Sequence, residues 1–299
     1  MARSPILPRT LDDPTGQDRR ERGAMRAFSA KLRQVLRLYR SALDGIPFTV
    51  VTTNAKVYQY LLDETVLLNL QAELSLAVDR ILLEGGPDRL WFVLQYVIPG
   101  YQQGTAAQWA NLGAQSVEYQ RSRAALEQVL LSPAYQRRLG LIRARQFEGM
   151  AGFSATVKQQ MARILTDGAS VGKGPLEIAR DLSAQLGILD RRAQAIARTE
   201  IPGAFRTARL EEAAQAQVEF GWLSREMHLS ALSPTTRPDH AARHAELYTI
   251  QAQKVWWSQD GNSINCKCST ITVLVDAQGN PLSTGIVAKA KAMRPAPAA

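Results

Sequence analysis

With 299 residues the chain is long enough for two folded units, because most domains contain about 100 to 200 residues. Hydrophobic residues make up 45% of the chain and charged residues 21%, a balance that is typical of globular proteins and excludes a largely disordered chain. The net charge of +9 at pH 7 favours polyanionic partners such as nucleic acid.

Residues 1–24 predict a flexible basic arm, because prolines and a glycine are scattered among its charged residues. This segment contains no apolar region of a secretory signal, and the longest apolar stretch of the chain is too short to span a bilayer. We therefore expect a protein that is made and kept in the cytosol, with no membrane partner. Met1 to Asp44 contain ten Lys or Arg against five Asp or Glu, so the arm either is solvated or contacts DNA.

Residues 25–149 predict a helical domain. Apolar residues recur at spacings of three and four over Met25–Leu43, and leucines follow the same period over Val57–Leu83. Further helices are predicted over Tyr101–Leu112 and Ser116–Leu131.

Residues 150–276 predict a second domain that combines helices with a small β-sheet. Pro202-Gly203 should kink or end a helix near Ile201. Val218–Leu223 and Thr270–Val275 have the β-branched and aromatic content of strands. Residues 277–299 predict a flexible tail. The fold class is therefore α+β and mostly α-helical, with a helical N-terminal domain before a domain of helices and a small sheet.

A group of potential metal ligands lies in the second domain. Cys266 and Cys268 are separated by one residue, and His240 and His244 have the spacing of one helical turn. These four side chains could form a closed tetrahedral site for a structural zinc ion. The alternative is a metal-free arrangement of two surface histidines and two small buried thiols that flank a strand.

The same residues permit an enzymatic alternative, a metal-dependent nuclease or peptidase that uses His240, His244 and Asp239. No glutamate accompanies the histidine pair as a general base, and carboxylates that could bind metal are not clustered nearby. We therefore expect that the protein is not an enzyme and has no catalytic residues.

Five segments, in this order, resemble the phage Mu F-like (also SPP1-type) head morphogenesis family of minor capsid proteins. The segments are a glycine loop followed by the helix that begins Pro175-Leu176-Glu177-Ile178-Ala179, then Ile196-Ala197-Arg198-Thr199-Glu200, Trp222, Arg237-Pro238-Asp239-His240 and Asn265-Cys266-Lys267-Cys268. The resemblance covers residues 150–276. This chain has Cys-Lys-Cys where family members have Cys-Arg-Cys, and it has Ser230 and Ser233 where some relatives carry another cysteine pair.

The resemblance implies a few-copy virion component of a tailed phage or prophage, located inside the head near the portal and present in the host cytoplasm during assembly. The implied role is in head assembly and in DNA packaging or delivery. The implied partners are the portal protein and the major capsid or scaffold protein. The charge of the N-terminal arm separately predicts that DNA is bound there.

Overall fold

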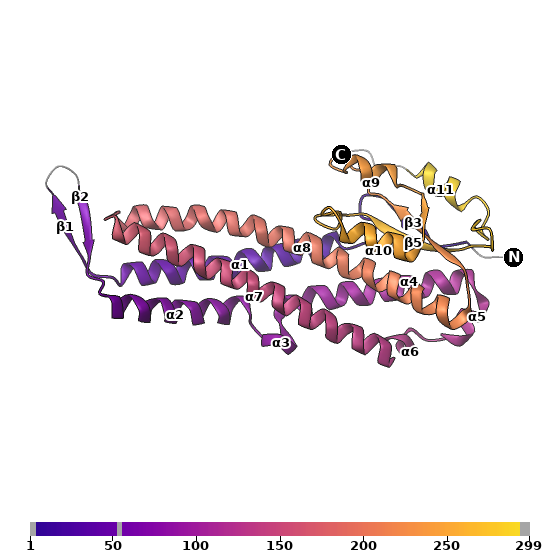
Figure 1. The fold of residues 1–299 in the computed structure, drawn as a ribbon, viewed down its shortest axis with the longest axis horizontal. Coiled ribbons are helices and arrows are strands. Elements are labelled where there is room, and N and C mark those ends of the chain that lie inside the picture. The colour runs from indigo at the N-terminus through magenta and orange to yellow at the C-terminus, as the bar shows by residue number, and fades with distance from the viewer. Residues whose placement is uncertain (1–3, 53–55, 294–299) are drawn as a thin grey trace. The chain divides into compact units, whose positions relative to one another are not determined.

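A computed structural model of the chain describes residues 4–52 and 56–293 (Figure 1). It is 67% helical and contains two small antiparallel sheets, which confirms the predicted mostly α-helical α+β class. The helices are α1 (Asp18–Asp44), α2 (Glu64–Leu82), α3 (Gly86–Arg89), α4 (Ile98–Gln115), α5 (Val117–Ser122), α6 (Leu126–Leu130), α7 (Pro133–Ser170), α8 (Pro175–Phe220), α9 (Pro238–Ala242), α10 (Ile250–Ser258) and α11 (Ile286–Ala292), with a π-helical turn at Val93–Val97. The strands are β1 (Phe48–Thr52), β2 (Lys56–Tyr60), β3 (Ser224–Leu229), β4 (Leu247–Tyr248) and β5 (Ser269–Leu274). No helix among the described residues is both long and apolar enough to cross a membrane.

The chain forms two compact units, each assembled from separate segments. The helical unit contains residues 23–94 and 140–196, and the sheet unit contains residues 1–22, 95–139 and 197–299. These boundaries differ from the sequence boundaries after residues 24, 149 and 276, because α1, α7 and α8 each contribute residues to both units. The division of the sequence at those three positions stays a prediction.

The helical unit is organised around aromatic side chains from three segments. Phe28 of α1 lies 4.9 Å from Trp91, 5.0 Å from Phe92 and 6.1 Å from Phe153 of α7, measured between ring centroids. Aromatic pairs at such distances add stability beyond the area that they bury. The apolar period predicted over Met25–Leu43 is thus the face that α1 buries in this core.

A β-hairpin occupies the beginning of a segment for which the sequence predicts a helix. β1 and β2 pair antiparallel, with Phe48 opposite Tyr60, and α2 begins only at Glu64 after its cap Asp63. The predicted helix start at Val57 is therefore wrong. The alternation of β-branched and aromatic residues in Val57-Tyr58-Gln59-Tyr60 favours a strand, and Tyr58 N donates to Gly172 O at 3.1 Å.

The sheet unit contains an antiparallel sheet in the order β4-β3-β5, in which Met227 of β3 lies opposite Ile271 of β5. The strand predicted over Thr270–Val275 is present as β5. The strand predicted over Val218–Leu223 is wrong, because α8 continues to Phe220 and β3 begins at Ser224. Gly221, with φ of +66°, separates the helix from the strand in a conformation that favours glycine.

Side-chain amides of α4 satisfy the outer edge of β5. Thr272 O accepts hydrogen bonds from Asn111 Nδ2 and Gln115 Nε2, both at 2.9 Å, and Leu274 N donates to Gln115 Oε1 at 3.0 Å. An unpaired strand edge is a template for pairing with another chain. Here α4 provides the partners that a further strand would supply.

Both predicted flexible ends include ordered structure in the sheet unit. Leu11 is fully buried, Ile6 N donates to Asn111 Oδ1 at 2.9 Å, and α1 already begins at Asp18. Near the other end, Ile286 and Ala290 of α11 are buried in the core that contains Met227 and Ile271. The predicted arm and tail are therefore ordered over residues 4–24 and 277–293. Isolated apolar residues within these polar segments are buried and hold the segments in place. Residues 1–3 and 294–299 lie outside the described residues.

Candidate metal centre

His240, Cys266 and Cys268 meet in the sheet unit. The two cysteines precede β5, and His240 belongs to the single turn of α9. All three residues are buried, with exposed fractions of 2% for His240, 3% for Cys266 and 2% for Cys268. Among the described residues this is the one group of three His, Cys, Asp or Glu residues whose ligand atoms all lie within 4.8 Å of one another.

The distances in this cluster match the dimensions of a tetrahedral zinc site. His240 Nδ1 lies 3.4 Å from Cys268 Sγ and 3.5 Å from Cys266 Sγ. Zinc bonds of about 2.3 Å to sulfur and about 2.0 to 2.1 Å to nitrogen place adjacent N and S ligands about 3.5 Å apart at a tetrahedral angle. The three side chains can therefore hold zinc with little rearrangement.

His244 is not part of this cluster. Ser230 N donates to His244 Nδ1 at 3.2 Å, and His244 Nε2 lies 3.0 Å from Ala290 O of α11, which requires the proton on Nε2. Because both ring nitrogens have other partners, the structure does not bring His244 into the cluster, and its role as a metal ligand stays a prediction. The helical spacing of four fails because α9 ends at Ala242, before it reaches His244.

Arg206 of α8 holds the backbone of the two cysteines. Its Nη1 donates to Cys266 O at 2.6 Å and to Cys268 O at 3.3 Å, and its guanidinium lies 4.8 Å from the centre of the Trp257 ring. Bonds to two carbonyls, together with packing on an aromatic face, fix the cysteine segment against α8. Arg206 was not predicted as a site residue. What could have indicated it is its position as a charged residue on the same helix face as Pro202 and Ala213, which are buried.

The two thiols interact and differ in acidity. Cys268 donates its S–H to Cys266, which lowers the pKa of Cys266 to about 3 despite burial, and the positive charge of Arg206 acts in the same direction. The same bond and burial raise the pKa of Cys268. Cys266 is therefore the more acidic thiol of the pair, and a bound metal ion would displace the protons that the two thiols carry.

Aromatic side chains surround the imidazole rings. Trp256 lies edge-on to His240 at 4.6 Å and edge-on to His228 at 5.1 Å between centroids. Burial lowers the pKa of His228 to about 3, so this third histidine is neutral at physiological pH. His228 was not predicted to lie near the site, and the alternation of β3 places it on a buried face.

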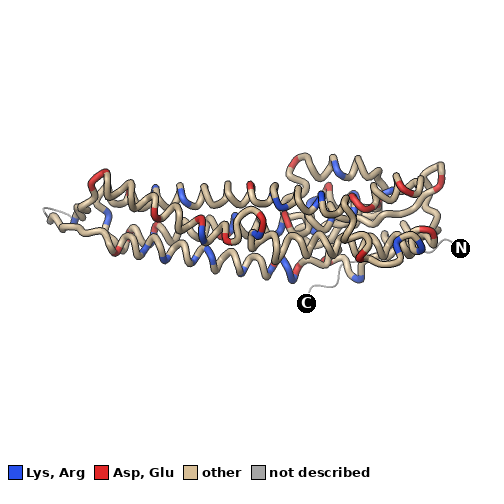
Figure 2. The backbone as a smooth tube through the Cα atoms, turned by 90° about the horizontal axis from the view of Figure 1, so that it is seen from below, with Lys and Arg blue, Asp and Glu red and all other residues tan. Residues whose placement is uncertain are grey.

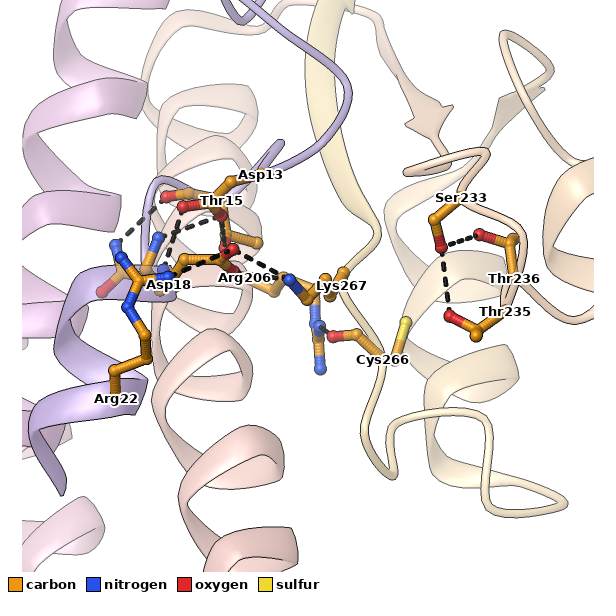
Figure 3. Close-up of polar contacts among 11 residues, drawn as sticks. Asp13, Thr15, Asp18, Arg22, Arg206, Ser233, Thr235, Thr236, Cys266 and Lys267 are labelled. Carbon is orange, nitrogen blue, oxygen red and sulfur yellow. Dashed lines mark hydrogen bonds and ion pairs between the residues drawn. The ribbon is translucent and has the colours of Figure 1, made fainter. Parts of the chain in front are cut away.

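Lys267, between the two cysteines, links this segment to the start of α1. Its Nζ donates to both carboxylate oxygens of Asp18, at 2.8 Å and 2.9 Å (Figure 3). Asp13 in turn accepts hydrogen bonds from Gln17 N and Asp18 N and so caps the helix. The N-terminal segment and the cysteine segment are thus joined by an ion pair next to the cluster.

The set of residues that the hydrolase alternative requires is not assembled in one place. Asp239 Oδ2 lies 3.9 Å from His240 Nε2, the ring nitrogen that does not contact the thiols, and its side chain is half exposed. His244 is engaged elsewhere. At 3.9 Å Asp239 does not hydrogen-bond to His240, and the structure does not bring Asp239 together with two histidines around one metal position.

Residues 159–271 match the family described as "Phage Mu protein F like protein". This region contains part of α7, all of α8 and the site residues up to the first half of β5. No curated protein and no solved structure matches the chain.

Proposed function

Residues 159–271 make this chain a member of the phage Mu F-like family, and from that premise we propose that it is a minor capsid protein associated with the portal vertex inside the head of a tailed phage or prophage. Membership supports a role related to phage head morphogenesis. The proposed partners are the portal protein and the major capsid or scaffold protein, which the protein meets in the host cytoplasm during assembly. The observation that carries this proposal is the family match, which includes the helix α8 and the cysteine segment that it holds.

Portal association can be tested with the portal protein of the same phage. The purified full-length chain should co-elute with portal oligomers, and heads purified from a deletion phage should lack this protein while DNA packaging or delivery is impaired. Failure to co-elute, together with normal yields of infectious particles from the deletion phage, would refute the proposed role.

We also propose that DNA is bound by an arginine face of the helical unit. Arg26, Arg33, Arg37 and Arg40 are exposed, and the 3.6-residue period places them within a sector of about 60° on α1. No described carboxylate forms an ion pair with any of these four arginines. Lys and Arg positions recur along the helices (Figure 2). This arrangement supports contacts between the arginines of α1 and DNA phosphates. These arginines belong to the basic region, residues 1–44, for which the sequence predicts DNA contact.

Helix α8 extends the arginine face. Ser29 donates to Asp190, and Arg40 Nη2 donates to Ser183 Oγ at 2.7 Å, so α1 lies against this part of α8. Arg180 and Arg191 are exposed on α8, on the side next to these contacts by the helical period. We name the six residues Arg26, Arg33, Arg37, Arg40, Arg180 and Arg191 the arginine face. Arginines that have no carboxylate partner bind the phosphate groups of the DNA backbone. Such binding does not depend on base sequence.

We further propose that His240, Cys266 and Cys268 bind zinc as a structural element of the sheet unit. The supporting observation is the agreement of both N–S distances with a tetrahedral centre. Zinc there would join α9 to the beginning of β5, and its binding free energy would contribute to folding.

A further inference from the structure

A polar cavity of about 470 Å³ borders the three ligand residues. His240, Cys266 and Cys268 all contribute to its wall, so a metal ion held among them faces the cavity. A cavity of this size is in the range of small-molecule sites. A ligand bound in this cavity could therefore complete the coordination of the metal.

The described protein residues supply three of the four ligands of a tetrahedral centre. His244 is occupied by Ser230 N and Ala290 O, and Asp239 lies beside the far nitrogen of His240. Structural zinc sites have four protein ligands, whereas sites with three protein ligands keep a position for water or an exogenous ligand. The ligand count thus favours an open centre.

The wall of the cavity contains a cation whose charge is not neutralised by a carboxylate. Arg198, Arg237 and Lys267 line the cavity and the described lining contains no Asp or Glu, but Lys267 forms its ion pair with Asp18 outside this lining. Arg237 donates to the carbonyls of Gly261 and Asn262, at 3.1 Å and 2.9 Å, and these neutral acceptors leave its charge uncompensated. An anion is therefore favoured over a cation or an apolar ligand.

Hydroxyl groups line the same cavity. Ser233 Oγ lies 3.2 Å from Thr235 Oγ1 and 3.1 Å from Thr236 Oγ1 (Figure 3). Hydroxyls and cations together are the groups that bind phosphate oxygens.

We infer that the His240, Cys266 and Cys268 centre binds a small oxyanion of the phosphate or phosphate monoester class as its exchangeable fourth ligand. This inference rests on the proposed zinc site but not on portal association. The oxyanion occupies the cavity, bound to the metal on one side and to Arg237 and the hydroxyls on the other. Because no carboxylate lines the described cavity wall to act as a general base, the centre is a binding site, and no bond of the ligand is broken.

The test uses the full-length protein loaded with Co²⁺, whose absorption spectrum reports thiolate ligation and coordination number. We expect one Co²⁺ per chain, a saturable spectral change when inorganic phosphate is added, and faster ³¹P relaxation than with the Zn²⁺-loaded protein. Arg237→Gln should keep the thiolate-to-cobalt band and weaken phosphate binding about tenfold, the equivalent of one charge-assisted hydrogen bond. His244→Gln is the matched control and should change neither metal stoichiometry nor phosphate binding.

The outcomes separate the open centre from the metal site itself. One Co²⁺ per chain with no spectral or ³¹P response to phosphate would mean a closed centre and would overturn the inference while leaving the metal. Absence of stoichiometric metal would overturn both. Equal phosphate affinity in Arg237→Gln and the unmodified protein would remove the cavity from the binding site and would also overturn the inference.

Discussion

At the scale of single residues, the two histidines of α9 and the turn after it have different tasks. His240 has one ring nitrogen within 3.5 Å of both thiols, whereas His244 bridges Ser230 N and Ala290 O. The first arrangement can hold a metal, and the second connects the end of β3 to α11. Substituting the two histidines one at a time therefore distinguishes an effect on metal binding from an effect on packing.

We expect His240→Ala to abolish stoichiometric zinc binding, because two thiols without the imidazole leave an incomplete site. His244→Ala should retain one zinc per chain and lower the free energy of unfolding by about 1 to 3 kcal/mol, because two hydrogen bonds no longer form. Metal analysis and denaturant unfolding of both variants provide the measurements. Loss of zinc in His244→Ala with an intact fold would contradict this assignment.

Glu21 of α1 makes stability depend on pH. It is 5% exposed, and burial together with the charge of Asp18 raises its pKa to about 7. Between its usual pKa of 4.5 and about 7, the folded protein keeps a proton that the unfolded chain has released. The contribution of Glu21 to stability is therefore fully present below pH 4.5 and decreases as the pH rises to about 7.

We expect Glu21→Gln to remove this pH dependence and to raise the free energy of unfolding at pH 8 by up to about 3 kcal/mol. Chemical denaturation of both proteins at about pH 5 and about pH 8 measures the difference. An unchanged slope of stability against pH in the variant would show that Glu21 is ionised in the folded protein.

At the scale of elements, α4 and α8 approach closely in the sheet unit. A Cβ atom on Gly104 of α4 would lie 2.3 Å from Phe205 O and 2.9 Å from Ala208 Cβ. Both are fixed atoms of α8, so a side chain cannot be accommodated without moving a helix. This close approach also lies one turn after Pro202, where α8 continues without ending.

Gly104→Ala should lower the free energy of unfolding by about 1 to 3 kcal/mol, the usual cost of overpacking. Gly113→Ala is the matched control on the same helix, because nothing lies within 4 Å of the added atom. The control should be neutral or stabilising by up to about 1 kcal/mol. Equal stability of the two variants in denaturant unfolding would contradict the close approach of the helices.

The arginine face is an element-scale feature because its residues align only when α1 and α8 are helical. Replacement of Arg26, Arg33, Arg37 and Arg40 by Gln should weaken binding to duplex DNA. It should also reduce the slope of log affinity against log salt concentration, by about 0.9 for each phosphate group that the variant no longer neutralises. Fluorescence anisotropy at several salt concentrations measures both quantities.

A control with the same reduction in charge distinguishes a site from net charge. Gln substitutions at Arg80, Arg89, Arg121 and Arg137, which are also exposed, should leave the salt slope nearly unchanged. If both quadruple variants show equally weakened DNA binding, affinity depends on total charge and the arginine face is not the site.

At the scale of the whole molecule, the proposed zinc ion would couple metal binding to the folding of the sheet unit. Removal of zinc by a chelator should lower the melting temperature of the zinc-loaded chain, since an ion that binds only the folded state stabilises it. Differential scanning calorimetry with and without chelator measures the shift. The double variant Cys266→Ser/Cys268→Ser should melt at the same temperature in both conditions, and a chelator-insensitive native protein with no bound zinc would leave the cluster as a metal-free packing arrangement.

The sequence by itself determined the helical character of the chain, the strand β5 and the order of the family segments. These features depend on local spacing: the apolar period of Met25–Leu43 produces one buried helix face, and the β-branched run at Thr270–Val275 produces a strand. One local rule, that proline ends a helix, was wrong for this chain. Pro202 does not end α8, because Ile201 and Phe205 are buried on either side of it and their packing compensates for the missing hydrogen bond.

Only the tertiary structure decided which candidate ligands meet. His240 and Cys268 are 28 positions apart but 3.4 Å apart in space, while His244, four positions from His240, bonds to Ala290 O instead. Sequence spacing predicts a shared face only while a helix continues, and α9 ends before His244. Arg206 reaches the cysteine carbonyls from α8 for the same reason: contacts between distant segments arise from packing, which no local pattern encodes.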